Sequence, residues 1–97
     1  MKRYCLLLNA SGIPVEKAFL YGSYSRGDAR LHSDIDVAIV SSAFDTSNDL
    51  LKAKAWRLTE HIDIKIEPYT IGLQRFLTDD VSPLLQIVRQ EGIEIVL

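Results

Sequence analysis

Two short apolar runs, joined by a polar segment, limit the folds open to this chain more than any other feature. The first run ends at Gly22-Ser23, and ten residues later Asp34-Ile35-Asp36 opens the second. Apolar runs of this length, bounded by glycine and polar residues, are typical of buried strands. The pattern therefore predicts two strands, with a glycine-led turn at the end of one and two aspartates at the start of the other.

These two polar groups suit complementary chemistry. In a turn that follows a strand, backbone N–H groups and the Ser23 hydroxyl can point at one anion. Asp34 and Asp36 are two residues apart, so in a strand they project from the same face, roughly 7 Å apart along the chain, and carboxylate oxygens at this spacing can bind hard cations. A phosphate cradle beside a metal pair indicates phosphoryl or nucleotidyl transfer.

The motif Gly-Ser, ten residues, Asp-x-Asp resembles the signature of the DNA polymerase beta type nucleotidyltransferase superfamily. With 97 residues the chain is similar to its smallest branch, the minimal nucleotidyltransferases (MNT), which are often the antitoxin half of HEPN/MNT pairs. Tyr24-Ser25 departs from the arginine-alanine pair frequent there. The resemblance covers nearly the whole chain and implies an α/β fold, a polymerase beta-like palm in which helices flank a small mixed sheet of three to four strands.

The remaining patterns predict alternating helices and strands. Thr46-Ser47-Asn48-Asp49 has the form of a capping box, and Ser82-Pro83 that of a cap with a first-turn proline. The expected helices are residues 2–10, a short helix or turn over 23–29, a helix from the capping box to near 61, a short one over 71–77, and one from Pro83 to Gly92; the expected strands are residues 15–21, 36–40, 62–67 and the edge strand 93–96.

The third expected strand offers another carboxylate. Ile62-Asp63-Ile64-Lys65-Ile66-Glu67 alternates apolar and charged residues, and Pro68 is expected to end it. By position in the family pattern, Asp63 is the carboxylate that would complete the triad with Asp34 and Asp36. Glu67 is its rival, roughly 13 Å further along the strand.

The resemblance implies in-line displacement at the alpha-phosphate of ATP or another nucleoside triphosphate, with pyrophosphate leaving. Asp34 and Asp36 would bind two Mg²⁺ ions, and Asp63 would bind the second metal and accept the proton of the attacking hydroxyl. Gly22 and Ser23 would hold the beta and gamma phosphates. Arg26 is a further candidate for contact with the triphosphate.

Other conspicuous side chains have simpler interpretations. Arg30 is an alternative to Arg26, and Trp56 on the third helix fits a core or interface position better than a base-stacking one. Asp28 is expected to cap or stabilise the turn through its side chain rather than to bind a metal. His32 and His61 lack the spacing of zinc ligands. Cys5 shares a helical face with apolar residues and is expected to pack there.

Composition narrows the class of protein. The chain is 47% hydrophobic with a formal charge of −2, so it is expected to be one globular domain over residues 1–97 without a basic field for long nucleic acid. It has one cysteine and no long apolar run, and a reduced, cytoplasmic location without a membrane span is expected.

The acceptor of the nucleotide is expected to come from another molecule, because the chain after Glu67 has room only for short helices and an edge strand. For the minimal branch the resemblance implies a helical HEPN-domain partner, which an AMP-transferring antitoxin would modify. Two alternatives stay open: a transferase acting on a small hydroxyl compound such as an aminoglycoside, with a homo-oligomer completing the pocket, or a nucleotide-binding module that inhibits its partner by occlusion. Phe76, Leu77 and residues 93–97 are candidates for the partner surface.

Overall fold

A four-stranded mixed sheet forms the centre of the computed structural model, which describes residues 1–27, 33–46 and 49–97, with Tyr24 and Ser25 described by their backbone alone. The strands are β1 (Lys17–Tyr21), β2 (Ile35–Ser41), β3 (Ile66–Gly72) and β4 (Ile93–Glu94). Their order is β3-β2-β1-β4; β1 is antiparallel to both neighbours and β2 is parallel to β3. This is the mixed α/β architecture that the sequence predicted.

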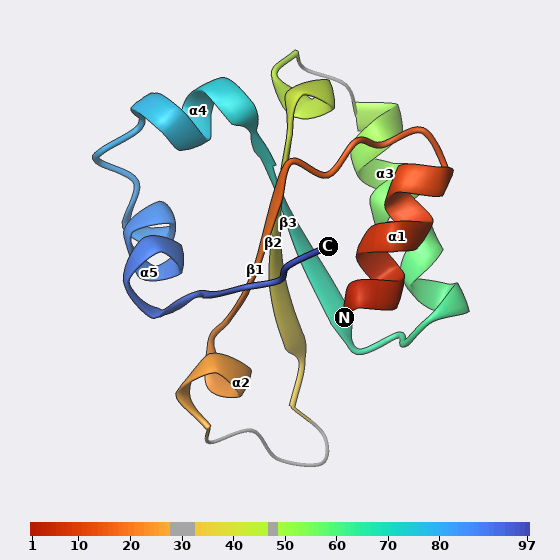
Figure 1. The fold of residues 1–97 in the computed structure, drawn as a ribbon, viewed down its shortest axis with the longest axis horizontal. Helices are drawn as coiled ribbons and strands as arrows, with labels where there is room; N and C mark the ends of the chain where they lie inside the picture. The colour runs from red at the N-terminus through yellow and green to blue at the C-terminus, as the bar shows by residue number, and fades with distance from the viewer. Residues whose placement is uncertain (28–32, 47–48) are drawn as a thin grey trace.

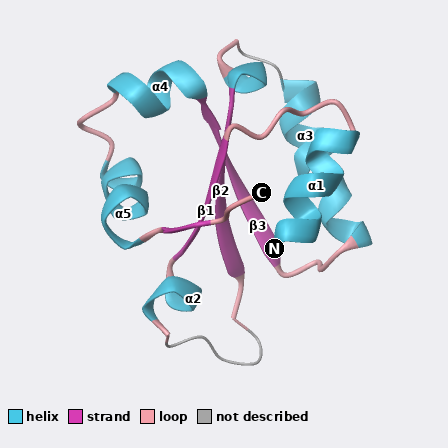
Figure 2. Ribbon diagram, in the orientation of Figure 1, coloured by secondary structure: helices cyan, strands magenta, loops and turns pink. Residues whose placement is uncertain are grey.

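Helices cover both faces of this sheet (Figure 1). One face packs against α1 (Lys2–Ala10) and α3 (Asp49–Leu58), and the other against α4 (Leu73–Thr78) and α5 (Pro83–Glu91). The short helix α2 (Ser23–Arg26) lies at the end of the sheet where β1 stops (Figure 2), and two 3₁₀ turns, η1 (Ser42–Phe44) and η2 (Thr59–His61), follow β2 and α3. In the described part of the chain, no helix has the length and apolar character needed to cross a bilayer.

Helix α1 is held against the sheet by one face. Tyr4, Cys5 and Leu8 are fully buried, as expected for residues that share a helical face. The Tyr4 hydroxyl also donates a 2.6 Å hydrogen bond to the Ala55 carbonyl of α3, so the two helices are joined by a polar contact inside the core. Burial raises the pKa of the Cys5 thiol to about 11, which agrees with the packing position expected for it.

The structure confirms most expected elements and moves several boundaries. The helix over residues 2–10 is confirmed, and so is the cap of α5, where the Ser82 hydroxyl accepts from the Leu85 N–H. Strand β1 begins two residues later than expected, α2 is shorter, and β4 spans two residues. The capping box expected before α3 includes residues 47–48, which lie outside the described residues.

The prediction of a strand over residues 62–67 is wrong. Asp63 lies in a turn, where its backbone N–H donates to the Thr59 carbonyl and its carboxylate accepts from the Lys65 N–H at 2.9 Å. Ile64, an apolar position of the expected strand, is 80% exposed. The strand β3 starts at Ile66 and runs through Pro68, because an edge strand tolerates a residue without an N–H group on its unpaired side.

Candidate functional site

A cavity of about 460 Å³ lies at the end of the sheet where β1 stops and β2 begins. It is on the face covered by α5, and both the turn and the aspartates singled out in the sequence line it. The described residues around it are Tyr21, Gly22, Ser23, Arg26, Ser33, Asp34, Asp36, Glu67, Leu84 and Ile87. Its volume is within the range of small-molecule sites.

Strand register places three of these side chains in a row. Tyr21 of β1 pairs with Asp36 of β2, and Asp36 pairs with Glu67 of β3. Directly paired residues of neighbouring strands project from the same face of a sheet. In the same strands, Ala38 and Ile71 lie an even number of residues away and pack in the core beneath α4 and α5, so the row points toward that side.

Gly22 comes into close contact with this row. Its backbone has φ +73° and ψ −145°, and a Cβ atom built there would lie 2.5 Å from Oδ2 of Asp36. Only glycine combines this backbone conformation with so close an approach. Gly22 thus allows the turn to lie directly against the Asp36 carboxylate.

Ser23 begins the helix that leaves this turn. The Arg26 N–H donates back to the Gly22 carbonyl at 3.2 Å, and Gly27, at φ +76°, ends the helix in a left-handed conformation. The first N–H groups of a helix have no acceptor within the helix. At the start of α2 these donors, together with the Ser23 hydroxyl, are available to an anion in the cavity.

Arg26 connects α2 to the opposite wall of the cavity. Its guanidinium lies 3.5 Å from the Glu91 carboxylate at the end of α5, and both side chains are about half exposed. Ile87 and Leu84, one and two turns earlier on the same face of α5, supply an apolar wall. The sequence analysis predicted α5 but missed this wall, although the spacing of residues 84, 87 and 91 marks one helical face.

Crowded carboxylates shape the electrostatics of the cavity. Partial burial raises the pKa of Asp36, the charge of Asp34 raises it further, and Arg26 and a hydrogen bond with Glu67 oppose the rise. Partial burial also raises the pKa of Glu67, as do the charges of Asp34 and Asp36 and hydrogen bonds to both. Burial raises the pKa of Tyr21 to about 12, and the charges of Asp36, Tyr69 and Glu67 contribute to the rise. Asp36 and Glu67 therefore resist being ionised together unless a cation joins them.

The chemistry of this donor set fits a divalent cation. Within the described ranges, no three His, Cys, Asp or Glu side chains are already arranged to enclose a metal ion. Asp34, Asp36 and Glu67 nevertheless share one cavity, and Glu67 lies within interaction distance of both aspartates. Oxygen ligands of this kind suit Mg²⁺.

The structure differs from the sequence analysis at the third carboxylate. Asp63, the favoured candidate, lies in the turn before β3 and does not line the cavity, whereas its rival Glu67 does. The physical reason is the later start of β3, which carries Glu67 into register with Asp36. Trp56 is on α3, on the opposite side of the sheet, and Asp28, Arg30 and His32 lie outside the described residues.

Comparisons with known proteins agree with this geometry. Residues 9–95 match the family model described as polymerase beta, nucleotidyltransferase. A search among curated protein sequences finds no match.

Solved structures with the same fold include toxin–antitoxin complexes. One is a toxin–antitoxin with AMP-PNP, at a TM-score of 0.66 and 24% identity, covering 96% of this chain and 70% of that one. Another is a toxin–antitoxin MntA-HpeT mutant with two aspartate-to-glutamate substitutions, at a TM-score of 0.66 and 21% identity, covering 96% of this chain and 69% of that one. A third, from Sulfolobus solfataricus and assigned as a nucleotidyltransferase, has a TM-score of 0.65 and 16% identity and covers 96% and 73%. The fold is the polymerase beta-like one, and the chain belongs to the polymerase beta nucleotidyltransferase family.

Proposed function

We propose that this nucleotidyltransferase transfers AMP from ATP to a hydroxyl group on a partner protein, as the antitoxin of a HEPN/MNT toxin–antitoxin pair. The observation that carries the proposal is the meeting of the Gly22-Ser23 turn and three carboxylates in one cavity of about 460 Å³. The similar fold of a toxin–antitoxin complex that holds AMP-PNP supports it. A second supporting similarity is a toxin–antitoxin variant in which two aspartates were replaced.

The turn would bind the triphosphate. The Ser23 hydroxyl and the free N–H groups at the start of α2 donate to the beta and gamma phosphates, and Arg26 adds a positive charge from the same helix. As pyrophosphate leaves, negative charge builds on the oxygens that these donors already contact. The donors therefore stabilise the transition state more than the bound substrate.

Asp34, Asp36 and Glu67 would hold Mg²⁺, two ions in the complete site. When bound, the metal supplies Lewis-acid chemistry that lowers the pKa of the acceptor hydroxyl and neutralises phosphate charge. Because Gly22 has no side chain, the Asp36 carboxylate can lie directly against the turn, where a Cβ atom would clash with it.

Glu67 would also serve as general base. The acceptor oxygen forms a bond to the alpha-phosphorus, the bond from that phosphorus to the bridging oxygen breaks, and the hydroxyl proton passes to the Glu67 carboxylate. Glu67 thus takes the part that the sequence analysis assigned to Asp63.

An acceptor on another molecule can approach from the α5 side. Ile87 on that wall is 41% exposed, so the cavity is open to solvent there. A protein hydroxyl reaching past α5 would meet the alpha-phosphate beside the carboxylates.

The experiment combines the chain with ATP, Mg²⁺ and a candidate partner, a short helical protein encoded by a gene next to its own. Intact-mass spectrometry should show a gain of about 329 Da on the partner, the mass of an AMP residue, and Asp34→Asn/Asp36→Asn should abolish it. A partner that is inhibited but never gains mass, while Mg·ATP binds, would replace this proposal with occlusion. A gain on an aminoglycoside and none on the protein would replace it with small-molecule modification.

A further inference from the structure

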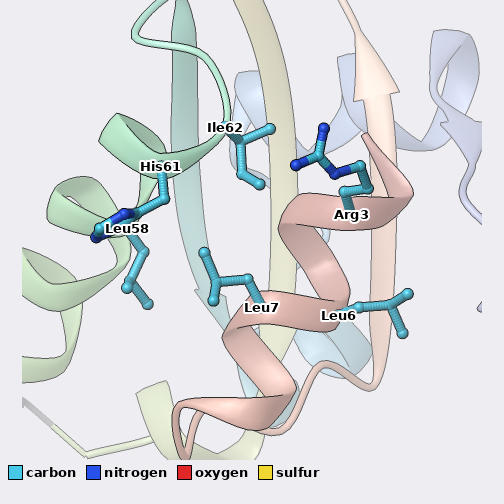
Figure 3. A pocket seen from close by; sticks show the side chains of 6 residues that line it. All are labelled: Arg3, Leu6, Leu7, Leu58, His61 and Ile62. Carbon is cyan, nitrogen blue, oxygen red and sulfur yellow. The ribbon is translucent and has the colours of Figure 1, made fainter.

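A second hollow, of about 550 Å³, lies between α1 and α3, on the other side of the sheet from α5 and the cavity (Figure 1). Figure 3 shows the side chains that line it. It follows the seam where α1 meets the end of α3 and η2, and we call it the α1–α3 groove. The residues that line it are Arg3, Leu6, Leu7, Leu58, His61 and Ile62.

The floor of the α1–α3 groove is aliphatic. Leu58 and Ile62 are partly buried and pack against the core, and Leu7 points toward them in Figure 3. Leu6, on the α1 side, is 51% exposed. Contiguous apolar surface of this kind marks an interaction site when it is rimmed by polar groups.

The rim of the groove is basic. Arg3 and His61 are its only ionisable lining residues among those described, and the Arg3 guanidinium extends over the groove toward Ile62. The chain as a whole has 13 acidic and 11 basic residues. A basic rim on an acidic protein complements a partner that presents a carboxylate beside apolar side chains.

The position of the groove leaves the cavity accessible. Ile62 precedes β3 by four residues, and β3 begins opposite Ile35 at the end of the sheet where the cavity lies. A segment bound between α1 and α3 is therefore on the opposite face from α5 but near the same end of the sheet. A partner protein bound by this segment can extend round the same end of the sheet without covering Asp34, Asp36 and Glu67.

We propose that the α1–α3 groove docks an amphipathic helix of the partner protein, which places aliphatic side chains on Leu7, Leu58 and Ile62 and a carboxylate against Arg3. Two helices packed side by side leave a furrow that fits a third, and recognition then rests on anchors spaced by one helical turn. The inference deepens the proposed function and rests on its claim of a protein partner. It adds which surface holds that partner and by which chemistry.

The test measures the dissociation constant of the neighbouring-gene partner by calorimetry, without nucleotide. Arg3→Glu and Leu6→Glu should each weaken binding at least 10-fold, since a hot-spot contact is lost and a like charge introduced. Arg3→Lys, which keeps the charge, should stay within about 3-fold of the wild type. Val96→Glu, on the competing C-terminal surface, is the matched control at a 75% exposed position and should have no effect.

Two outcomes overturn the docking surface. Unchanged binding by Arg3→Glu and Leu6→Glu would do so, and so would loss of binding by Val96→Glu alone. Circular dichroism checks that each variant is folded. Failure of the proposed function gives a different pattern, in which the partner binds in the groove-dependent way described here but gains no mass with ATP and Mg²⁺.

Discussion

Replacing Gly22 by alanine is the sharpest single perturbation of the site. The substitution adds one methyl group, yet at φ +73° and ψ −145° the backbone is close to a region that only glycine occupies readily. The new Cβ would also lie 2.5 Å from Oδ2 of Asp36, about 1 Å inside an ordinary contact. Either the turn or the Asp36 carboxylate must move.

The cost of this change has two parts. Backbone strain of this type amounts to about 1–3 kcal/mol, which for a domain of this size corresponds to a fall of about 5–20 °C in the melting temperature. The second part is functional, because displacement of Asp36 removes one ligand of the proposed metal site. Mg·AMP-PNP affinity should therefore fall by about 10-fold or more, beyond any effect of lower stability.

Two other glycines also have a positive φ but no close contact, so their alanine variants measure the backbone strain alone. Gly12, at φ +92°, and Gly27, at φ +76°, would each place a Cβ atom with no atom of the described residues within 4 Å. Their alanine variants should lose about 1–2 kcal/mol by urea denaturation, and Gly12→Ala, far from the cavity, should bind Mg·AMP-PNP as the wild type does in calorimetry. If Gly22→Ala matched Gly12→Ala in both stability and binding, the contact between Gly22 and Asp36 would have no functional meaning.

Four further expectations concern the acids and the core. Because the folded protein raises the pKa values of Asp36 and Glu67, their ionised forms disfavour folding at neutral pH; Asp36→Asn or Glu67→Gln should raise the melting temperature of the metal-free protein by a few degrees, and a fall would contradict this. The same raised pKa values mean that Mg²⁺ must displace protons, so its affinity should fall as the pH is lowered, with proton uptake by the buffer in calorimetry, and a pH-independent affinity would count against it. Tyr4→Phe removes the hydrogen bond to Ala55 and should cost about 0.5–1.5 kcal/mol in urea denaturation. Cys5 should stay unreactive toward a thiol reagent until the protein unfolds, and rapid labelling of the native chain would show that its burial is wrong.

Local sequence patterns were sufficient where the governing interactions are local. The helix over residues 2–10 follows from the spacing of Tyr4 and Leu8, and the start of α5 from Ser82 and Pro83, whose roles depend on neighbours within one turn. The Gly22-Ser23 turn and the Asp34-Ile35-Asp36 pair are likewise readable from the chain. The register between β1 and β2 then brings these two groups together.

The third carboxylate depends on information that the sequence pattern does not contain. Alternation over residues 62–67 fits a strand and an exposed turn equally well, and the hydrogen bond from Lys65 to the Asp63 side chain favours the turn. A proline typically ends a strand, but an edge strand tolerates it. The edge position of β3 follows from the order of the strands, which the local sequence around Pro68 does not contain. The spacing of residues 84, 87 and 91 marks one face of α5, but what that face and the α1–α3 groove lie against depends on tertiary packing, which no local pattern contains.

A direct comparison of Glu67→Gln with Asp63→Asn tests the central claim, that Asp34, Asp36 and Glu67 form the metal and nucleotide site. Titration calorimetry with Mg²⁺ and AMP-PNP measures the affinity of each variant, with Asp34→Asn/Asp36→Asn as the negative reference. The account predicts a loss of about 10-fold or more for Glu67→Gln and wild-type affinity for Asp63→Asn. Wild-type affinity in Glu67→Gln together with a large loss in Asp63→Asn would contradict it.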